Sequence, residues 1–207
     1  MLNYVTAQTV LIPKGEDNEP CIAAFQAETG IEVPAFPDER LKVQSEGRTF
    51  YLLKGEDIPP LLARGFGDVG LAGTDACSEY MLGNWGMLQT RKIGNAMCRF
   101  SLLAEKRNAE RMRSLIQPSG RMVSAFQVAS RRPRMLTAVA AQQDLPLVPA
   151  LPSIRGSEEV IFSLMGLELG AAIVVSGDTA LQNDVCEIRT LCDVYPEIII
   201  RSSDANV

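Results

Sequence analysis

The sequence predicts an α/β protein with mainly parallel sheets, arranged as two lobes. Apolar, β-branched segments alternate with helical segments along the whole chain, which is typical of βαβ units. The composition changes near residues 90–95 and changes back near residue 176, so the chain should cross twice between lobes. We therefore expect one lobe from residues 1–92 and 178–207 and a second from residues 93–177. Ligands of such sheets bind beyond the carboxyl ends of the strands.

Each expected element of the first lobe is bounded by a recognisable stop. The strand at 5–12 ends at a Pro-Lys-Gly loop, and the helix at 19–29 ends at Gly30. Two strands at 41–45 and 49–54 form a hairpin around a Gly-containing turn. A helix at 58–64 has two prolines in its first turn. A buried strand at 68–73 precedes a helix at 74–81, for which Thr74 is the expected N-cap.

The second lobe continues the alternation. Its expected strands are 97–104, 122–129 and 171–175, with a Pro-punctuated extended segment at 145–151, and its expected helices are 133–142, begun by a proline, and 157–167. Residues 107–120 are basic and polar without a clear period, so no element is predicted there. Two last strands are expected at 185–191 and 197–201.

Composition excludes several classes of function. The 207-residue chain carries a net charge of −5, which argues against nucleic-acid binding, because phosphate neutralisation needs a basic surface. No apolar run is long enough to span a bilayer, so no membrane association is expected, and the first residues lack the pattern of a signal peptide. The five cysteines are scattered singly, which is typical of reduced thiols in a cytoplasmic protein.

The absence of histidine restricts the chemistry further. It removes imidazole metal sites, histidine general bases and Ser–His or Cys–His nucleophilic pairs. No metal-ligating set and no catalytic nucleophile is therefore predicted. A reaction at this chain should depend on positioning substrates and binding their anionic groups.

Two turns have the composition of anion-binding loops. A buried strand ends in Ser176, Gly177, Asp178 and Thr179, where exposed N–H groups, hydroxyls and a glycine precede a helical segment. The Gly73-Thr74-Asp75 turn follows another buried strand in the same way. Either turn is also compatible with an ordinary strand–turn–helix junction, in which Asp178, Ser176 or Thr74 is an N-cap.

Five stretches, in the same order, resemble the ATP phosphoribosyltransferases, the family that opens histidine biosynthesis. The stretches are Leu11-Ile12-Pro13-Lys14-Gly15, residues 50–59, Gly67-Asp68-Val69-Gly70-Leu71-Ala72-Gly73-Thr74-Asp75, Cys98-Arg99-Phe100 and Val128-Ala129-Ser130-Arg131-Arg132-Pro133. The third is the most specific. The length resembles that of the short form, which lacks the regulatory domain of the long form.

The resemblance implies a fold, a reaction and partners. The fold would be periplasmic-binding-protein-like (type II), with the site in a central cleft. The reaction would join N1 of ATP to C1 of phosphoribosyl pyrophosphate and release pyrophosphate, with magnesium carried by the substrate. Short forms depend on a regulatory subunit related to histidyl-tRNA synthetase, so a homodimer or larger oligomer is expected.

The resemblance also implies roles for residues at the substrate sites. The family loop that holds the 5-phosphate aligns with Ser176, Gly177, Asp178 and Thr179, whereas Lys14, Arg40 and Arg99 are candidates for binding pyrophosphate or triphosphate. Asp75 is a candidate for contacting a hydroxyl or the base. The expected substrate-binding residues are Lys14, Gly15, Arg40, Gly73, Thr74, Asp75, Arg99, Ser176, Gly177, Asp178 and Thr179.

The loop departs from the family pattern at three points. The acidic residue expected upstream falls on Ala172 or Ile173, Asp178 adds a negative charge, and an Asn-Gly pair is replaced by Asn183-Asp184. Three hypotheses therefore stay open: an ATP phosphoribosyltransferase with a diverged loop, an enzyme of the same fold with another substrate, and a non-catalytic module for binding a ligand or partner.

Overall fold

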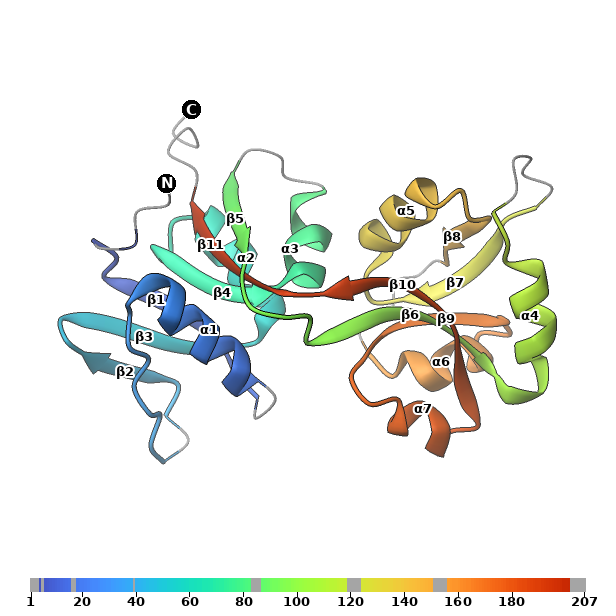
Figure 1. The fold of residues 1–207 in the computed structure, drawn as a ribbon, viewed down its shortest axis with the longest axis horizontal. Coiled ribbons are helices and arrows are strands. Elements are labelled where there is room, and N and C mark those ends of the chain that lie inside the picture. Colours follow the sequence, from blue (N-terminus) through green and yellow to red (C-terminus); the bar gives the residue numbers. More distant parts are fainter. Residues whose placement is uncertain are drawn as a thin grey trace. The chain divides into compact units, whose positions relative to one another are not determined.

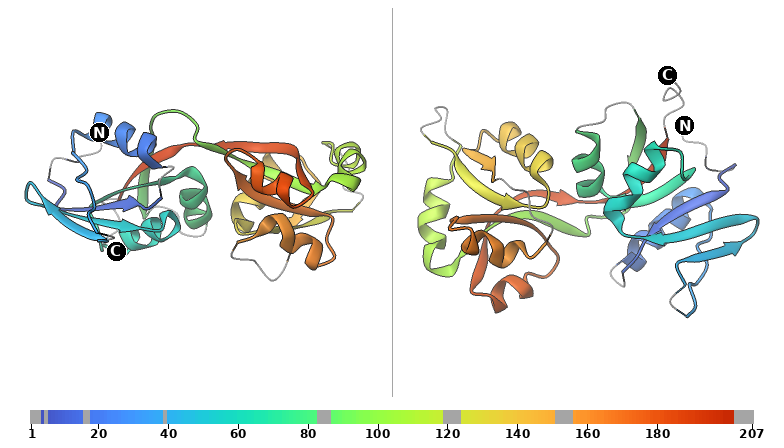
Figure 2. Two further views of the ribbon diagram at one scale, coloured as in Figure 1. Left: turned by 90° about the horizontal axis from the view of Figure 1, so that it is seen from below. Right: turned by 180° about the vertical axis from the view of Figure 1, so that it is seen from behind.

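The computed structural model describes residues 4, 6–15, 18–38, 40–82, 87–118, 124–150 and 156–201. The chain forms two compact units, Met1–Ala96 with Tyr195–Val207 and Met97–Val194 (Figure 1). The first crossing lies close to the predicted one. The second lies at residues 194–195, so the prediction that the chain returns at residue 178 is wrong. The reason is that β10 (Val185–Val194) pairs with β6 (Cys98–Glu105) along its whole length (Figure 2).

The first unit contains a six-stranded sheet in the order β2-β3-β1-β4-β11-β5. Only β1 pairs in parallel, with β3 and β4, and the other pairs are antiparallel. The strands are β1 (Thr9–Pro13), β2 (Lys42–Ser45), β3 (Arg48–Leu53), β4 (Val69–Gly73), β5 (Leu88–Lys92) and β11 (Pro196–Arg201). The helices are α1 (Glu19–Thr29), the 3-10 turn η2 (Gly55–Asp57), α2 (Ile58–Ala63) and α3 (Thr74–Met81).

Stop signals in the sequence explain where these helices end. Gly30 is the C-cap of α1 in a left-handed conformation, with φ +69°, and its N–H donates to the carbonyl of Gln26. The helix α2 begins with prolines and packs Ile58 and Leu62 against Gly70 of β4, where even a Cβ atom would clash. The bounds of α1, and the type of every element predicted in the first unit, are confirmed.

The second unit contains a five-stranded sheet in the order β10-β6-β9-β7-β8. Its remaining strands are β7 (Phe126–Ser130), β8 (Leu147–Pro149) and β9 (Leu169–Val174). Its helical segments are η3 (Lys106–Asn108), α4 (Ala109–Leu115), α5 (Pro133–Gln142), α6 (Glu158–Leu164) and α7 (Asp178–Gln182). The predicted strand at 122–129 begins outside the described residues, and its described part is β7.

The middle of the strand β6 is buried on both faces, which explains why apolar residues occupy successive positions at 102–104. Phe100, Leu102 and Ala104 pack with residues of α4 and α5, whereas Leu103 packs on the other face with residues of α6 and α7. Figure 1 shows α5 on one side of this sheet and α6 and α7 on the other. Arg99, Ser101 and Leu103 alternate with the first set, so they belong to the α6–α7 face.

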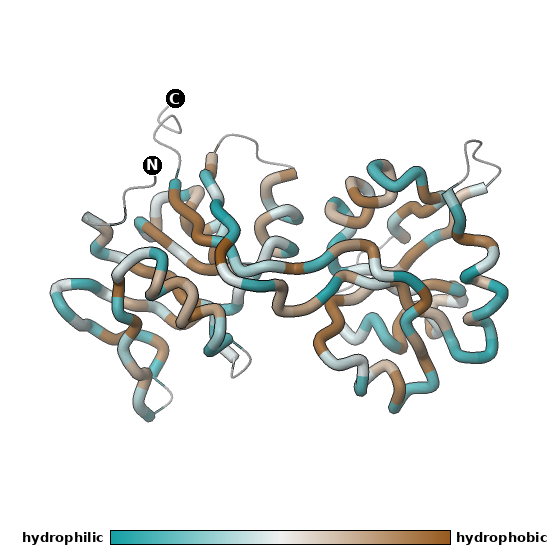
Figure 3. Tube along the Cα trace, viewed as in Figure 1, coloured by the Kyte–Doolittle hydropathy of each residue, from teal (hydrophilic) through white to brown (hydrophobic). Residues whose placement is uncertain are grey.

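Three sequence expectations need correction. Both sheets are mixed rather than mainly parallel, because β11 and β10 return antiparallel to their neighbours. The helix α4 was not predicted, since its mostly polar surface hides the two buried residues Ala109 and Met112 (Figure 3). The strand β5 was not predicted either, because it is an edge strand with one buried residue, Leu88.

None of the helices in the described part is long and apolar enough to cross a membrane.

Candidate functional site

The predicted phosphate loop follows β9 in the second unit. The ladder between β6 and β9 ends at the pair Arg99–Val174, so Val175, Ser176 and Gly177 leave the sheet before α7 begins. Gly177 has φ +92°, a conformation that glycine adopts without strain. The Ser176 hydroxyl accepts a 3.3 Å hydrogen bond from the Asp178 amide. The side chains of Ser176, Asp178 and Thr179 are exposed, whereas Ala180 is buried and anchors the helix.

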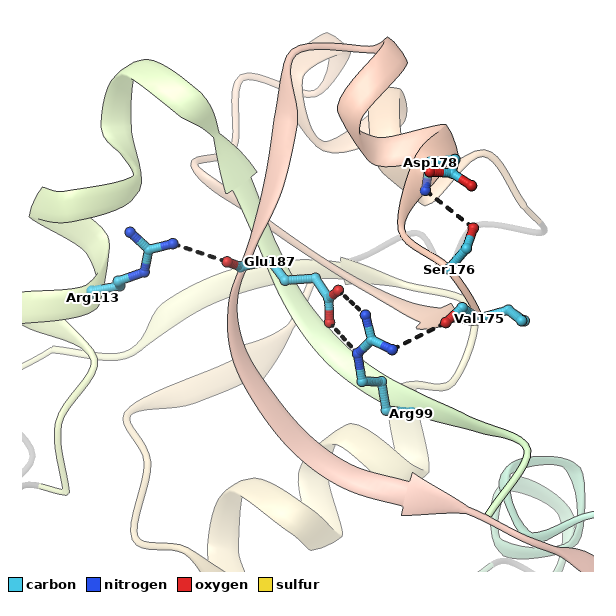
Figure 4. Close-up of polar contacts among 6 residues, drawn as sticks. All are labelled: Arg99, Arg113, Val175, Ser176, Asp178 and Glu187. Carbon is cyan, nitrogen blue, oxygen red and sulfur yellow. Dashed lines mark hydrogen bonds and ion pairs between the residues drawn. The ribbon is translucent and has the colours of Figure 1, made fainter. Parts of the chain in front are cut away.

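Arg99 lies beneath this loop and is occupied by protein groups (Figure 4). Its Nε donates to Glu187 Oε2 at 2.7 Å, its Nη2 forms an ion pair with Glu187 Oε1, and its Nη1 donates to the Val175 carbonyl at 3.0 Å. The bonds from Arg99 lower the pKa of Glu187, and the same contact raises the pKa of Arg99. Arg99 is therefore bonded within the second unit to Glu187 and to the carbonyl of Val175.

The other predicted residues meet at one edge of the first sheet. β1 pairs Pro13 with Leu53, and the Lys14 amide donates to the Leu53 carbonyl at 2.7 Å, which places Lys14 beside Lys54. β4 follows β1 in the sheet, runs parallel to it and ends at Gly73. The Leu52 amide donates to the Leu41 carbonyl, so Arg40 lies beside the end of β3. Residues far apart in sequence are thus brought to the carboxyl edge of the parallel strands, as predicted for a ligand site.

The cations at this edge are exposed and have no ion-pair partner among the described residues. Lys14, Arg40 and Lys54 are all solvent-exposed. Lys54 is not among the residues predicted for the site, although its position at the end of a predicted strand was an available signal. Gly15, next to Lys14, has φ +130°. The chain turns there, and the side chain of Asn18 donates to the Lys14 carbonyl at 3.0 Å.

The Gly73-Thr74-Asp75 turn is fixed by the start of β11. The Thr74 amide donates to the Tyr195 carbonyl at 2.8 Å, and the Tyr195 amide donates to Thr74 Oγ1 at 3.1 Å. The prediction that Thr74 is the N-cap is wrong: Gly73 is the N-cap, and Thr74 is the first residue of α3. Asp75 is buried in the first turn, where a carboxylate interacts favourably with the helix dipole.

A buried carboxyl group near this turn was not anticipated. Glu197 on β11 is 7% exposed and lies opposite Ala72 of β4. Burial raises its pKa, against the effects of a hydrogen bond with Cys77 and the charge of Lys92. Burial also raises the pKa of the Cys77 thiol, and the charge of Glu197 adds to that shift. The signal was a single glutamate at the start of an Ile-Ile-Ile run.

The described residues contain no group of three or more cysteine, aspartate or glutamate side chains placed to hold a metal ion. The described residues of both units offer groups that can bind anions. The first unit offers lysine and arginine side chains, and the second offers a loop of exposed hydroxyls and backbone amides.

Known proteins resemble the chain in sequence and in fold. The ATP phosphoribosyltransferase from Moorella thermoacetica is 23% identical over 188 residues, which cover 88% of this chain and 78% of that protein. The solved ATP phosphoribosyl transferase (HisG:HisZ) complex from Thermotoga maritima covers 93% of this chain and 86% of its matched chain, with a TM-score of 0.61 and 17% identity.

A second solved structure shares the fold alone. The alkanesulfonate-binding protein SsuA from Xanthomonas axonopodis pv. citri covers 94% of this chain and 65% of its own, with a TM-score of 0.52 and 10% identity. This likeness confirms the predicted type II, periplasmic-binding-protein-like fold class.

The family model described as HisG, ATP phosphoribosyltransferase, matches residues 54–206. The match includes Lys54, the Gly73-Thr74-Asp75 turn, Arg99 and the loop at 176–179, whereas Lys14, Gly15 and Arg40 precede it. It spans most of both units and agrees with the motifs found in the sequence. The chain therefore belongs to the ATP phosphoribosyltransferase family.

Proposed function

We propose that the chain transfers the phosphoribosyl group of phosphoribosyl pyrophosphate to N1 of ATP and releases pyrophosphate, the first step of histidine biosynthesis. The observation that carries this proposal is the family match over residues 54–206, which includes a candidate anion-binding element in each unit. In this proposal, the second unit holds the sugar phosphate and the first unit binds polyphosphate charge.

The loop after β9 would hold the 5-phosphate. The donors would be the backbone N–H groups of Ser176, Gly177 and Thr179 and the hydroxyls of Ser176 and Thr179. The two hydroxyl side chains are exposed, and Gly177 lets a phosphate approach the backbone. Asp178 is also exposed, so solvent and the magnesium ion that the substrate carries would offset its charge. The carboxylate would otherwise repel the phosphate.

The exposed cations of the first unit would bind the pyrophosphate and the triphosphate. Lys14, Arg40 and Lys54 lie next to one another in strand order at one sheet edge, and they have no ion-pair partner within the described ranges. Asp75, beside them at the start of α3, would accept a hydrogen bond from a ribose hydroxyl or from the base.

The reaction makes few demands on side-chain chemistry. The adenine nitrogen displaces pyrophosphate from C1 of the ribose, so the C1–O bond breaks as the N1–C1 bond forms and no enzyme intermediate is needed. The protein contributes by holding two polyanions in line and by stabilising the leaving pyrophosphate. A chain without histidine can perform this reaction.

We extend the proposal to the assembly and the cellular location. The matched Thermotoga maritima structure is a complex of two kinds of subunit, HisG and HisZ. A regulatory subunit related to histidyl-tRNA synthetase would accordingly be needed for full activity. The chain itself would form a homodimer or a larger oligomer, and the assembly would be located in the cytoplasm.

Calorimetric titration with magnesium phosphoribosyl pyrophosphate, and then with ATP, tests the proposal. We expect binding of both substrates and, with a regulatory subunit added, an adduct of the two that mass spectrometry detects. The Thr179→Val variant should weaken binding of phosphoribosyl pyrophosphate. Failure of the wild-type chain to bind phosphoribosyl pyrophosphate would contradict the proposal.

A non-catalytic binding module is the second candidate. The position of the family's acidic residue favours it, because that position falls on Ala172 or Ile173 and neither side chain can bind ribose hydroxyls. This candidate predicts binding of a substrate without adduct formation, with or without the added subunit.

A further inference from the structure

We propose that Arg99 and Glu187 are a positioning pair that sets the conformation of the phosphate loop, so that Arg99 acts through the loop rather than as a substrate ligand. This inference rests on the proposed function for its effect on substrate binding. Its evidence is the bonding of the pair, the backbone that aims Glu187, and the packing of Gly177 over both side chains.

The first observation is the use that Arg99 makes of its planar fork. Two of its nitrogens bond the two oxygens of Glu187, which fixes the plane of the guanidinium. The third, Nη1, then donates to the Val175 carbonyl at 3.0 Å. Because the sheet ladder stops at Val174, this bond continues the attachment of the chain to β6 by one residue beyond the sheet.

The second observation is the backbone irregularity at Glu187. The pairing of β10 with β6 shifts between Glu187 and Arg189, as in a β-bulge, a feature that often redirects a side chain next to a functional site. The Glu187 carbonyl accepts a 3.1 Å hydrogen bond from Arg113 Nη2 of α4, so this part of β10 is anchored from a second element (Figure 4). Glu187 is paired with Leu103, which lies on the same face of β6 as Arg99, so its carboxylate reaches Arg99 on that face.

The third observation is the position of Gly177. A Cβ atom there would lie 3.5 Å from Glu187 Oε1, 3.8 Å from Val174 Cγ1 and 3.9 Å from Arg99 Nη2. The loop thus rests on the pair, at the residue whose φ of +92° turns the chain into α7.

Two variants distinguish the two possible roles of Arg99, which are positioning the loop and binding phosphate directly through its charge. If Arg99 bound phosphate through its charge, Arg99→Lys would keep much of the function and Glu187→Gln would leave the cation available. If the pair positions the loop, both variants fail, because lysine has no planar fork and glutamine cannot accept two charged N–H bonds. The exposed Arg111–Glu168 ion pair, in the same unit, supplies the matched control Arg111→Ala.

The test measures substrate binding and loop protection together in the full chain. In Arg99→Lys and Glu187→Gln we expect the Kd for magnesium phosphoribosyl pyrophosphate to rise about tenfold, the size usual for losing a charged hydrogen bond. The Kd for ATP should be unchanged, and Arg111→Ala should match wild type in both. In the double variant Arg99→Ala/Glu187→Ala, the Kd for phosphoribosyl pyrophosphate should rise no further than in the more severely affected single alanine variant. Both substitutions disrupt the same interaction, so their effects do not add.

Hydrogen exchange of the amides at 175–179 separates this inference from the proposed function, since it needs no substrate. Exchange should be faster in Arg99→Lys and Glu187→Gln than in wild type and in Arg111→Ala. Unchanged exchange in both variants would overturn the positioning pair, even if the chain is active. Faster exchange in a chain that does not bind phosphoribosyl pyrophosphate would uphold the pair and reject the proposed function. A normal Kd in Glu187→Gln with a raised Kd in Arg99→Ala would make Arg99 a substrate ligand.

Discussion

Glu197 of β11 and Cys77 of α3 are both buried in the first unit, and the charge of the carboxyl group adds to the raised pKa of the thiol. Burial raises the pKa of Glu197, so the folded chain holds this proton at pH values where the unfolded chain has released it. The free energy of unfolding should therefore fall as pH rises from the unfolded pKa through the folded one.

The variant Glu197→Gln should remove that pH dependence. We expect it to be more stable than wild type at pH 8, by about 1 kcal/mol, the usual size of a single-substitution effect, and close to wild type at pH 4. Urea unfolding at several pH values measures the difference. Glu32→Gln, an exposed carboxylate of the same unit, is the control and should show no such crossover. A constant difference at all pH values would contradict the prediction.

The cations at the carboxyl edge of the first sheet should contribute to substrate affinity. Lys54→Ala and Lys14→Ala should each weaken binding of ATP or of phosphoribosyl pyrophosphate about tenfold, because each removes a charged contact to phosphate. Calorimetry gives the affinities. Arg64→Ala is the matched control: Arg64 follows α2 next to Gly65, which lies by Arg201 at the opposite edge of the sheet. Equal losses in all three variants would indicate a general charge effect and not a site.

Two glycines should be essential for packing within separate units. A Cβ atom at Gly70 would lie 2.7 Å from Ile58 Cγ2, and one at Gly170 would lie 2.8 Å from Phe162 Cδ1. Gly70→Ala and Gly170→Ala should each cost about 1–3 kcal/mol by overpacking. Hydrogen exchange should show the loss of protection concentrated in the unit that carries the substitution. Gly30→Ala, where a Cβ would meet nothing within 4 Å, isolates the cost of the left-handed backbone.

Gly177 should be sensitive because of its backbone conformation. Its φ of +92° strains any other residue, whereas a Cβ atom would make only ordinary van der Waals contacts with the Arg99–Glu187 pair, so relief of the strain should displace the loop from the pair. Gly177→Ala should cost about 1 kcal/mol of stability and also weaken binding of phosphoribosyl pyrophosphate. Gly47→Ala, with φ +76° and open space around it, carries the backbone strain alone. If both variants lost similar stability and bound the substrate normally, the prediction that Gly177 is needed for substrate binding by the loop would be contradicted.

Most elements of the fold could be predicted from the sequence, because local signals mark where those elements begin and end. The prolines of α2 and α5 and Gly30 after α1 mark helix ends by steric rules that hold in any context. The helix α4 and the strand β5 lacked such signals, since each buries only one or two residues. The second crossing was misplaced because the pairing of β10 with β6 depends on contacts about 80 residues apart, which local patterns do not encode.

The loops of the candidate site could be predicted from the sequence, whereas the contacts between its residues could not. Strand-to-helix turns rich in glycine and hydroxyl residues identified 73–75 and 176–179, and both lie at carboxyl ends of strands. The partner of Arg99 could not be predicted, because Glu187 lies 88 residues away in the sequence and comes to its face through the pairing of β10 with β6. The grouping of Arg40, Lys54 and Lys14 likewise follows from the strand order β2-β3-β1, which the sequence left open.

The two glutamates at positions 187 and 197 should respond to pH in opposite directions. Bonding to Arg99 lowers the pKa of Glu187, so its contribution to stability is present above the unfolded pKa and is lost as pH falls through the folded one. Wild type should therefore lose stability relative to Glu187→Gln on acidification, whereas it gains stability relative to Glu197→Gln. Urea unfolding between pH 3 and pH 8 measures both differences. If the Glu187 difference did not shrink at low pH, the carboxylate would not be the stabilising form, and the charge-based account of the pair with Arg99 would fail.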